Sequence, residues 1–109
     1  MQRLTPRLVK LEGNEKFQRL LAGAPDTAGM KSGHVTLKPG ESIGEHTTEA
    51  REETIIILEG QAEFYCEGKL LFNAQEKFIL YVPPHTTHDI KNNGDNLLRY
   101  VYIVAPIHA

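Results

Sequence analysis

The most regular feature of the sequence is a series of short apolar runs separated by turn residues. Gly, Pro and Asn punctuate the chain between the runs, as at Pro39-Gly40, Pro83-Pro84 and Asn93-Gly94. Short strands at intervals of about 8–12 residues with such turns are typical of an all-β sandwich or barrel. We therefore predict an all-β fold with strands in the apolar runs, which are residues 8–11, 17–21, 34–37, 54–58, 62–66, 70–72, 78–82 and 97–104.

Two short segments have sequence features that predict their local structure. Asn14 could cap a helix over residues 14–21, because several apolar residues there fall at helical spacing. The segment is short, however, so we prefer a strand. Glu67-Gly68 is typical of a tight turn and predicts a hairpin that joins Tyr65 to Leu70.

Composition narrows the class of protein. The chain has 109 residues, 40% of them hydrophobic, which fits one domain spanning 1–109. Its 12 basic and 14 acidic residues give a formal net charge of -2. This near-neutral, acidic-leaning balance argues against a nucleic-acid partner.

The distribution of apolar residues and cysteine bears on location. No apolar run approaches the roughly 18 residues that span a bilayer, and the N-terminal sequence lacks the features of a signal peptide. The chain has one cysteine, Cys66, which we expect to be a buried, inert thiol. These features predict a cytoplasmic protein with no membrane partner.

Candidate chemistry lies in two polar clusters, residues 39–54 and 81–92. Side chains two residues apart share one face of a strand, so His46 shares a face with Thr48. By the same rule Glu53 lies in line with Ile55 and Ile57, and its neighbour Glu52 faces outward. A buried carboxylate is costly unless it is paired or binds a metal. Imidazoles and a carboxylate converging from adjacent strands could hold a divalent metal.

The two clusters resemble the paired signature motifs of the cupin superfamily. The first motif spans about 40–60 and the second about 77–92, and each follows the family spacing. The first motif is carried by Gly40, His46, Thr48, Glu53 and Gly60, and the second by Lys77, Pro83, His85, His88 and Asn92. Within the superfamily the chain resembles small single-domain cupins with a His-x-Thr first motif. The resemblance implies a small β-barrel or jelly roll, that is, a double-stranded β-helix.

The departures from the family pattern define the expected site. Thr48 stands where the family has a second histidine, which reduces the implied ligand set to His46, Glu53 and His88. Two histidines and one carboxylate can still hold Fe, Zn, Mn or Ni and leave positions open for water or substrate. A threonine hydroxyl is a poor ligand, but it could hydrogen-bond a metal-bound water.

Several other residues could line the cavity. His85 replaces a family glycine, which implies a left-handed backbone there and an exposed turn residue, although it could also reach the mouth of the site. Tyr100 and Tyr102 share one face of the last strand, and Arg99 lies on the other; either face could line the cavity. His34 should face outward if Val35 and its neighbours face the core. The terminal residue His108 should be inert.

Three functions remain open. The first is a metal-dependent enzyme acting on a small molecule as an oxygenase, isomerase or lyase. The second is a module that binds or senses a small ligand without catalysis. The third, weaker hypothesis is a metal-free barrel in which Arg99 or Lys91 pairs with Glu53. We also expect a homodimer, in which an N-terminal strand over residues 4–11 meets the sheet edge of a second copy.

Overall fold

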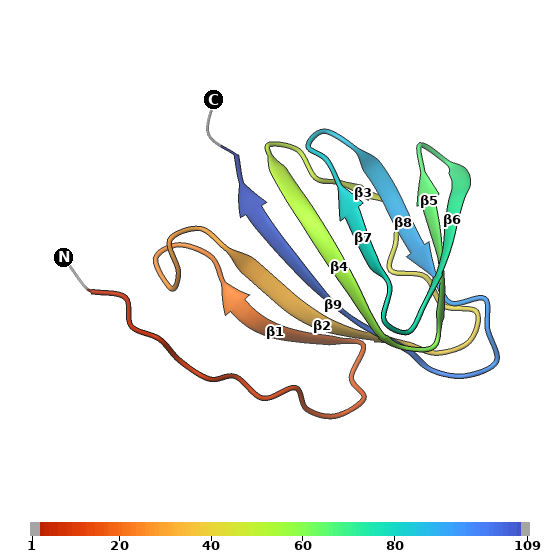
Figure 1. Cartoon of the computed structure of the whole chain (residues 1–109), viewed down its shortest axis with the longest axis horizontal. Coiled ribbons are helices and arrows are strands. Elements are labelled where there is room, and N and C mark those ends of the chain that lie inside the picture. The colour runs from red at the N-terminus through yellow and green to blue at the C-terminus, as the bar shows by residue number, and fades with distance from the viewer. Residues whose placement is uncertain (1–2, 108–109) are drawn as a thin grey trace.

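The computed structural model describes residues 3–107, which fold into two antiparallel β-sheets without a helix (Figure 1). The prediction of an all-β fold is therefore confirmed. The strands are β1 (Phe17–Ala22), β2 (Lys31–Leu37), β3 (His46–Thr47), β4 (Arg51–Glu59), β5 (Gln61–Cys66), β6 (Lys69–Gln75), β7 (Ile79–Val82), β8 (Thr87–Lys91) and β9 (Leu98–Pro106).

The two sheets enclose a shared core. The first has the order β1-β2-β9-β4-β7 and the second the order β3-β8-β5-β6. Figure 1 shows them as two layers that converge at one end of the molecule and spread apart at the other. The buried apolar side chains come from both sheets: Val35, Leu37, Ile55, Ile57, Ala62, Phe64, Ala74, Leu80, Val82, Ile90, Leu98 and Tyr100.

Alternation along β4 explains why one carboxylate lies in this core. Glu53, Ile55 and Ile57 are buried, whereas the residues between them are partly exposed. Since side chains alternate between the faces of a strand, burial of the two isoleucines carries Glu53 to the same inner face. β9 pairs with β4 along its length and places Tyr100 opposite Ile57.

The turns follow the sequence closely. Glu67 and Gly68 both have positive φ and connect Cys66 to Lys69, so the predicted hairpin is present. Lys77 and His85, which replace family glycines, also have positive φ, at 75° and 53°. The backbone requirement for which the family uses glycine is thus retained at both positions.

One predicted strand is absent. Residues 8–11 form no strand, because this segment pairs with neither sheet and its side chains are exposed. Figure 1 shows the N-terminal segment extending beside β1, away from the two layers. The next segment is a strand from Phe17, not a helix, because β1 pairs with β2.

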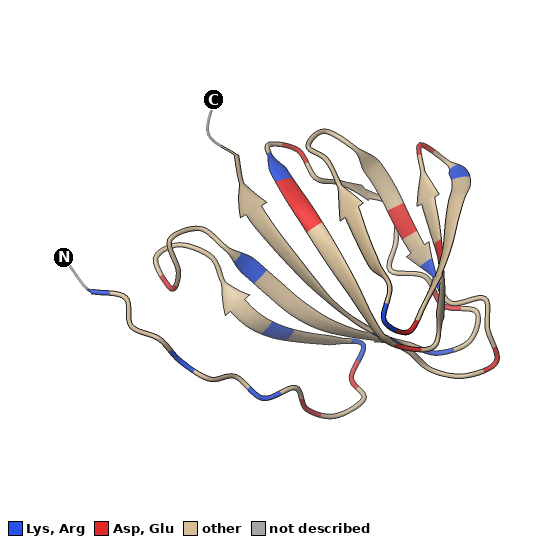
Figure 2. Ribbon diagram, viewed as in Figure 1, with Lys and Arg blue, Asp and Glu red and all other residues tan. Residues whose placement is uncertain are grey.

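Charge is unevenly distributed along the chain. Figure 2 shows mainly basic positions in the N-terminal segment, β1 and β2, and mainly acidic positions around β4, β8 and the loops near them. Within residues 3–107 the structure has no helix with the length and hydropathy needed to span a membrane.

Candidate metal centre

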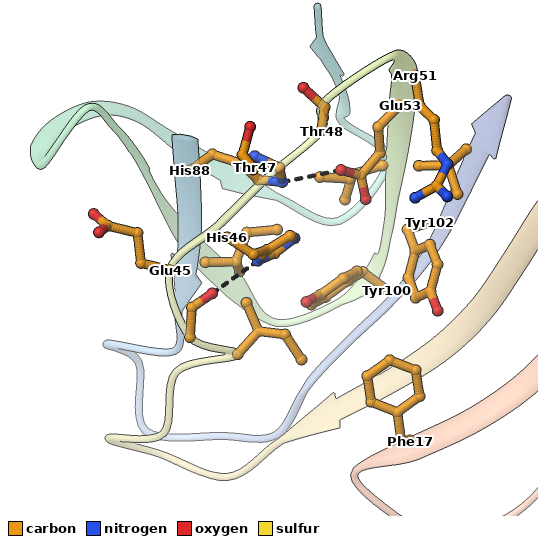
Figure 3. A pocket seen from close by; sticks show the side chains of 15 residues that line it. Phe17, Glu45, His46, Thr47, Thr48, Arg51, Glu53, His88, Tyr100 and Tyr102 are labelled. Carbon is orange, nitrogen blue, oxygen red and sulfur yellow. Dashed lines mark hydrogen bonds and ion pairs between the residues drawn. The ribbon is translucent and has the colours of Figure 1, made fainter. Parts of the chain in front are cut away.

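The two sheets bring three of the predicted site residues together (Figure 3). His46 on β3 and His88 on β8 are direct cross-strand partners, and their ring centroids lie 4.2 Å apart. Glu53 approaches from β4 in the opposite sheet. Strand pairing within one sheet therefore brings the two histidines together, and the facing of the two sheets adds Glu53.

Backbone carbonyls orient both imidazole rings. Nδ1 of His46 lies 2.8 Å from the carbonyl oxygen of Gly44, and Nδ1 of His88 lies 3.1 Å from that of Thr86. A carbonyl oxygen can only accept a hydrogen bond, so each Nδ1 carries the proton. In the neutral ring Nε2 then keeps its lone pair, as in histidines whose Nδ1 is fixed behind a metal.

The loop before β3 is itself held in place. The amide of Gly44 donates a hydrogen bond of 3.0 Å to Oδ1 of Asp89, and the glycine has a φ of 106°. A side chain at this φ would be strained, so a glycine suits the position. The contact from Asp89 thus fixes the carbonyl group that orients His46.

Glu53 and His88 form the closest contact in the cluster. Nε2 of His88 lies 2.9 Å from Oε1 of Glu53, and both side chains are buried. The contact is short but poorly aligned, since buried Nε2 has no hydrogen-bond partner of good geometry among residues 3–107. Burial acts to lower the pKa of His88, but the contact with Glu53, the bond to the Thr86 carbonyl and the charge of Glu53 outweigh it and raise the pKa.

The donor set fits a divalent metal ion. One ligand atom from each of His46, Glu53 and His88 lies within 4.8 Å of the other two. Metal bonds of about 2.0–2.2 Å place ligand atoms within about 4.4 Å of one another, so a small rotation of the exposed His46 ring could close the set. A metal ion would also replace the poorly aligned contact between Nε2 of His88 and Glu53. Two imidazoles and one carboxylate are ligands shared by Fe and Zn sites.

A cavity of about 420 Å³ opens beside the cluster. Tyr100 and Tyr102 both line it, so the inner face of β9 is the one that carries the tyrosines. Burial, followed by the negative charge of Glu53, raises the pKa of Tyr100 and of Tyr102, whereas Arg19 opposes the rise at Tyr102. Both hydroxyl groups therefore remain protonated at neutral pH and can donate hydrogen bonds.

The directions of the side chains show which carboxylate belongs to the cluster and whether Arg99 pairs with it. Glu52 lies on the outer face of β4 and accepts a hydrogen bond of 2.8 Å from the hydroxyl of Tyr81. Arg99 donates to Glu59 at 2.9 Å and also contacts Asn14, so it is not the partner of Glu53.

The hydroxyl group of Thr48 is bonded to the backbone on two sides, and its bond to a metal-bound water stays a prediction. Thr48 is buried in the cavity wall, where its hydroxyl donates to the carbonyl of Pro83 at 2.7 Å and accepts from the amide of Thr86 at 3.0 Å. Thr48 therefore ties the loop before β4 to the loop before β8.

His85 is not among the residues that line the cavity. It is exposed in its left-handed turn, and its amide donates 2.8 Å to the carbonyl of Glu49. The turn holds the backbone close to the site but leaves the ring outside it.

The remaining histidines and the cysteine lie elsewhere. His34 is on the opposite face of β2 from Val35, as expected, but it is only 3% exposed, and burial followed by the charge of Arg99 lowers its pKa. Cys66 is half-buried against the core rather than fully buried. His108 lies outside the described residues.

Sequence reasoning missed several residues of the cavity wall, among them Arg51 and Phe17. Arg51 lies two positions before Glu53, so the alternation that identified Glu53 would also have identified it. Phe17 lies on β1 and meets Tyr102 edge-on with ring centroids 5.9 Å apart. No local pattern indicates that contact, because it depends on the pairing of distant strands.

Comparison with known proteins identifies the family to which the chain belongs. The family model for the cupin domain matches residues 33–104, and the chain therefore belongs to the cupin domain family. This confirms the resemblance seen in the two motifs. Among curated proteins, none matches the chain significantly.

Solved structures support the same fold. An RmlC-like cupin family protein with a double-stranded β-helix fold from Methanocaldococcus jannaschii is similar with a TM-score of 0.74 and 22% identity, over 93% of this chain and 91% of that one. The Schizosaccharomyces pombe Cnp3 cupin domain has a TM-score of 0.76 and 23% identity, over 91% of this chain and 69% of that one.

A third similar structure is a predicted oxalate decarboxylase from Thermotoga maritima. It has a TM-score of 0.66 and 25% identity over 71% of this chain. The matched region spans 66% of the Thermotoga protein, slightly less than two thirds of its length.

Proposed function

We propose that the protein is a small cytoplasmic cupin that binds a divalent metal through His46, Glu53 and His88 and acts on a small molecule in the adjoining cavity. The observation that carries the proposal is the convergence of three ligand atoms, one each from His46, Glu53 and His88, within 4.8 Å of one another. Backbone carbonyls lie within hydrogen-bond distance of Nδ1 of both histidines, which leaves Nε2 of each ring for a metal ion. The buried contact between Nε2 of His88 and Glu53 is poorly aligned for a hydrogen bond, and a metal ion held by both groups would replace it.

The residues around the cluster support a metal-dependent enzyme of the oxygenase, isomerase or lyase type. A divalent metal bound there would supply Lewis-acid or oxygen-binding chemistry. The chain itself supplies two tyrosine hydroxyls that can orient a substrate, and apolar walls from residues such as Ile43 and Ile55 that exclude water. The similar Thermotoga protein, a predicted oxalate decarboxylase, is consistent with a lyase acting on a small acid.

Elemental analysis of protein purified without chelator tests the metal site. We expect about one metal ion per chain in the wild type and a loss of most of it in His88→Ala. His85→Ala is the matched control, because it removes an exposed imidazole three residues away and should keep the metal. Equal metal content in wild type and His88→Ala would refute the assignment.

A binding or sensing module is the second candidate function. It is favoured because the groups nearest the cluster are poorly suited to act as a general base: both tyrosines stay protonated and Glu53 contacts His88. Incubation of metal-loaded protein with a metabolite panel separates the two functions. Mass-shifted products support the enzyme, and thermal shifts without turnover support the binding module.

We also propose that the protein is a homodimer joined through its N-terminal segment. The side chain of Leu8 is 99% exposed, and the segment carries further exposed apolar side chains. It also carries Arg3, Arg7 and Lys10, whereas the region around β4 and β8 is mainly acidic (Figure 2). Arg7 pairs with Asp26 of its own chain, but the exposed apolar side chains and the other basic residues of the segment suit the surface of a second copy.

A further inference from the structure

The cavity contains one basic side chain that the metal cluster does not use. Arg51 is the first residue of β4, and its backbone pairs with Pro106 at the end of the sheet. The side chain lines the cavity together with Glu53 and Tyr102. Figure 3 shows its guanidinium group beside Glu53, directed towards the space that Tyr102 borders.

No carboxylate of residues 3–107 lies within ion-pair distance of this guanidinium group. The ion pairs of the described chain are Arg7–Asp26, His88–Glu53 and Arg99–Glu59. Glu53, the nearest acidic residue on the same face, directs Oε1 to His88 instead. Glu45 also lines the cavity, but Figure 3 shows its side chain turned away from Arg51.

The position of Arg51 relative to the cluster sets the size of what it could bind. Two residues of a strand span about 6.6 Å, so Arg51 and Glu53 leave the backbone one two-residue step apart on one face. A guanidinium group binds carboxylates through paired hydrogen bonds in one plane. The site can therefore hold a carboxylate at Arg51 and a second polar group several ångströms away at the metal cluster.

The rest of the wall is suited to the body of such a molecule. Tyr102 packs over Gly33, where an added Cβ would lie 2.7 Å from its ring, and it meets Phe17 at its edge. Val104 and Ile90 complete an apolar lining. The cavity thus has a cation beside the His–Glu–His cluster and an apolar wall next to both.

We propose that the cavity selects small organic acids and that Arg51 binds their carboxylate group. This inference rests on the proposed function, because the second end of the ligand faces the metal cluster. Arg51 is then the residue that determines specificity for an acid over its neutral analogue. It is a different role from that of Tyr100 and Tyr102, whose neutral hydroxyls would serve acid and amide alike.

Matched pairs of acids and amides test the proposal. The probes are 6-hydroxyhexanoate, 4-hydroxybenzoate and 3-(4-hydroxyphenyl)propionate, which carry a hydroxyl group at the end opposite the carboxylate. They and their primary amides are titrated calorimetrically into zinc-loaded protein. We expect at least one acid to bind the wild type about tenfold or more tightly than its amide, as is usual for a charge-assisted hydrogen-bond pair. Arg51→Gln should abolish that preference, and Arg51→Lys should restore part of it, since lysine keeps the charge but not the planar pair of donors.

Lys69→Gln is the matched control, because it removes the same charge from an exposed position on β6, outside the cavity. It should leave the preference for the acid unchanged. The proposal is overturned if no acid binds the wild type better than its amide. It is also overturned if the preference persists in Arg51→Gln, since the carboxylate would then bind the metal and not the arginine.

Measuring the metal content of each variant distinguishes a failure of this inference from a failure of the proposed function. Arg51→Gln should retain as much metal as the wild type, because Arg51 is not one of the three clustered ligands. Absence of metal from the wild type would refute the proposed metal site. The acid–amide preference, measured with and without Arg51, reports on the arginine alone.

Discussion

The chemical character of individual residues at this site is set by backbone groups as much as by side chains. A histidine can ligate through either nitrogen, and here the carbonyls of Gly44 and Thr86 reserve Nδ1 on His46 and His88. The neutral form of each ring therefore offers Nε2. Neither carbonyl could be assigned from the sequence, because their positions depend on the loops that precede β3 and β8.

Thr48 stands at a position where the family has a metal ligand, but here its hydroxyl group connects two loops. Its hydroxyl joins Pro83 and Thr86, and it is buried. Thr48→Val keeps the shape but leaves a buried carbonyl and amide without partners, so we expect a loss of about 1–3 kcal/mol in the free energy of unfolding. Thr48→Ser should lose less. Chemical denaturation gives the free energies.

The same variants separate a structural role from a ligand role. Thr48→Val should keep the metal content of the wild type when it is folded. A folded Thr48→Val that has lost its metal would show instead that the hydroxyl serves the cluster.

His34 predicts a pH dependence that is independent of the cluster. Burial and Arg99 lower its pKa in the folded state, so below the unfolded value of about 6.5 the unfolded chain takes up a proton that the folded chain resists. Stability from neutral His34 is thus fully present above about pH 6.5 and is lost as the pH falls towards the folded pKa. Urea denaturation of chelator-treated protein between pH 5 and 8 measures this.

His34→Gln provides the reference for that measurement. The difference in unfolding free energy between wild type and variant should be constant above about pH 7.5 and shift in favour of the variant below about 6.5. A difference that is constant over the whole range, or that shifts in favour of the wild type as the pH falls, would contradict this account of His34.

At the scale of the elements, the alternation of apolar and polar residues and the positions of turn residues predict most of the strands and turns. β4 shows why, because the same period-two pattern identifies the strand, its buried face and the inward direction of Glu53. Thr48 shows the limit of that argument. It follows β3 rather than lying within it, so the rule that residues two apart share a face does not direct its hydroxyl.

The features that the sequence does not predict depend on pairing between strands that lie far apart in the chain. Residues 8–11 have a strand-like composition, but they lack a partner strand, and composition cannot supply one. His34 faces away from Val35, as predicted, but its burial depends on contacts with neighbouring strands that the sequence pattern does not show. The contact between Phe17 and Tyr102 likewise depends on pairing across β2.

Gly60 gives a prediction for the sharp turn between β4 and β5. It has a φ of 87°, and an added Cβ would lie 2.9 Å from the Cα of Leu98 and would also meet the Leu97 carbonyl. Neither backbone atom can move aside cheaply, so Gly60→Ala should cost about 2 kcal/mol or more of unfolding free energy.

Gly68 is the matched position for this measurement. It also has a positive φ, at 79°, but an added Cβ there has open space within 4 Å. Gly68→Ala should therefore show the cost of the backbone angle alone and destabilise the protein less than Gly60→Ala. Equal losses in thermal or urea denaturation would mean that the close approach to β9 contributes nothing.

For the molecule as a whole, the exposed N-terminal segment predicts self-association. Leu8→Glu places a charge at a side chain that is 99% exposed, so it should leave the fold of one chain intact while weakening an apolar contact between chains. We expect light scattering to give a dimer mass for the wild type and a monomer mass for Leu8→Glu. A monomeric wild type would contradict the proposed dimer, and a variant that stays dimeric would place the interface elsewhere.

The central claim is that His46, Glu53 and His88 jointly hold a divalent metal. Anomalous diffraction from a crystal grown with the metal, measured on both sides of its absorption edge, tests this most directly. We predict one strong peak within about 2.0–2.2 Å of Nε2 of His46, Nε2 of His88 and a carboxylate oxygen of Glu53. A cluster that shows no peak in metal-saturated crystals, with Glu53 still paired only to His88, would contradict the account.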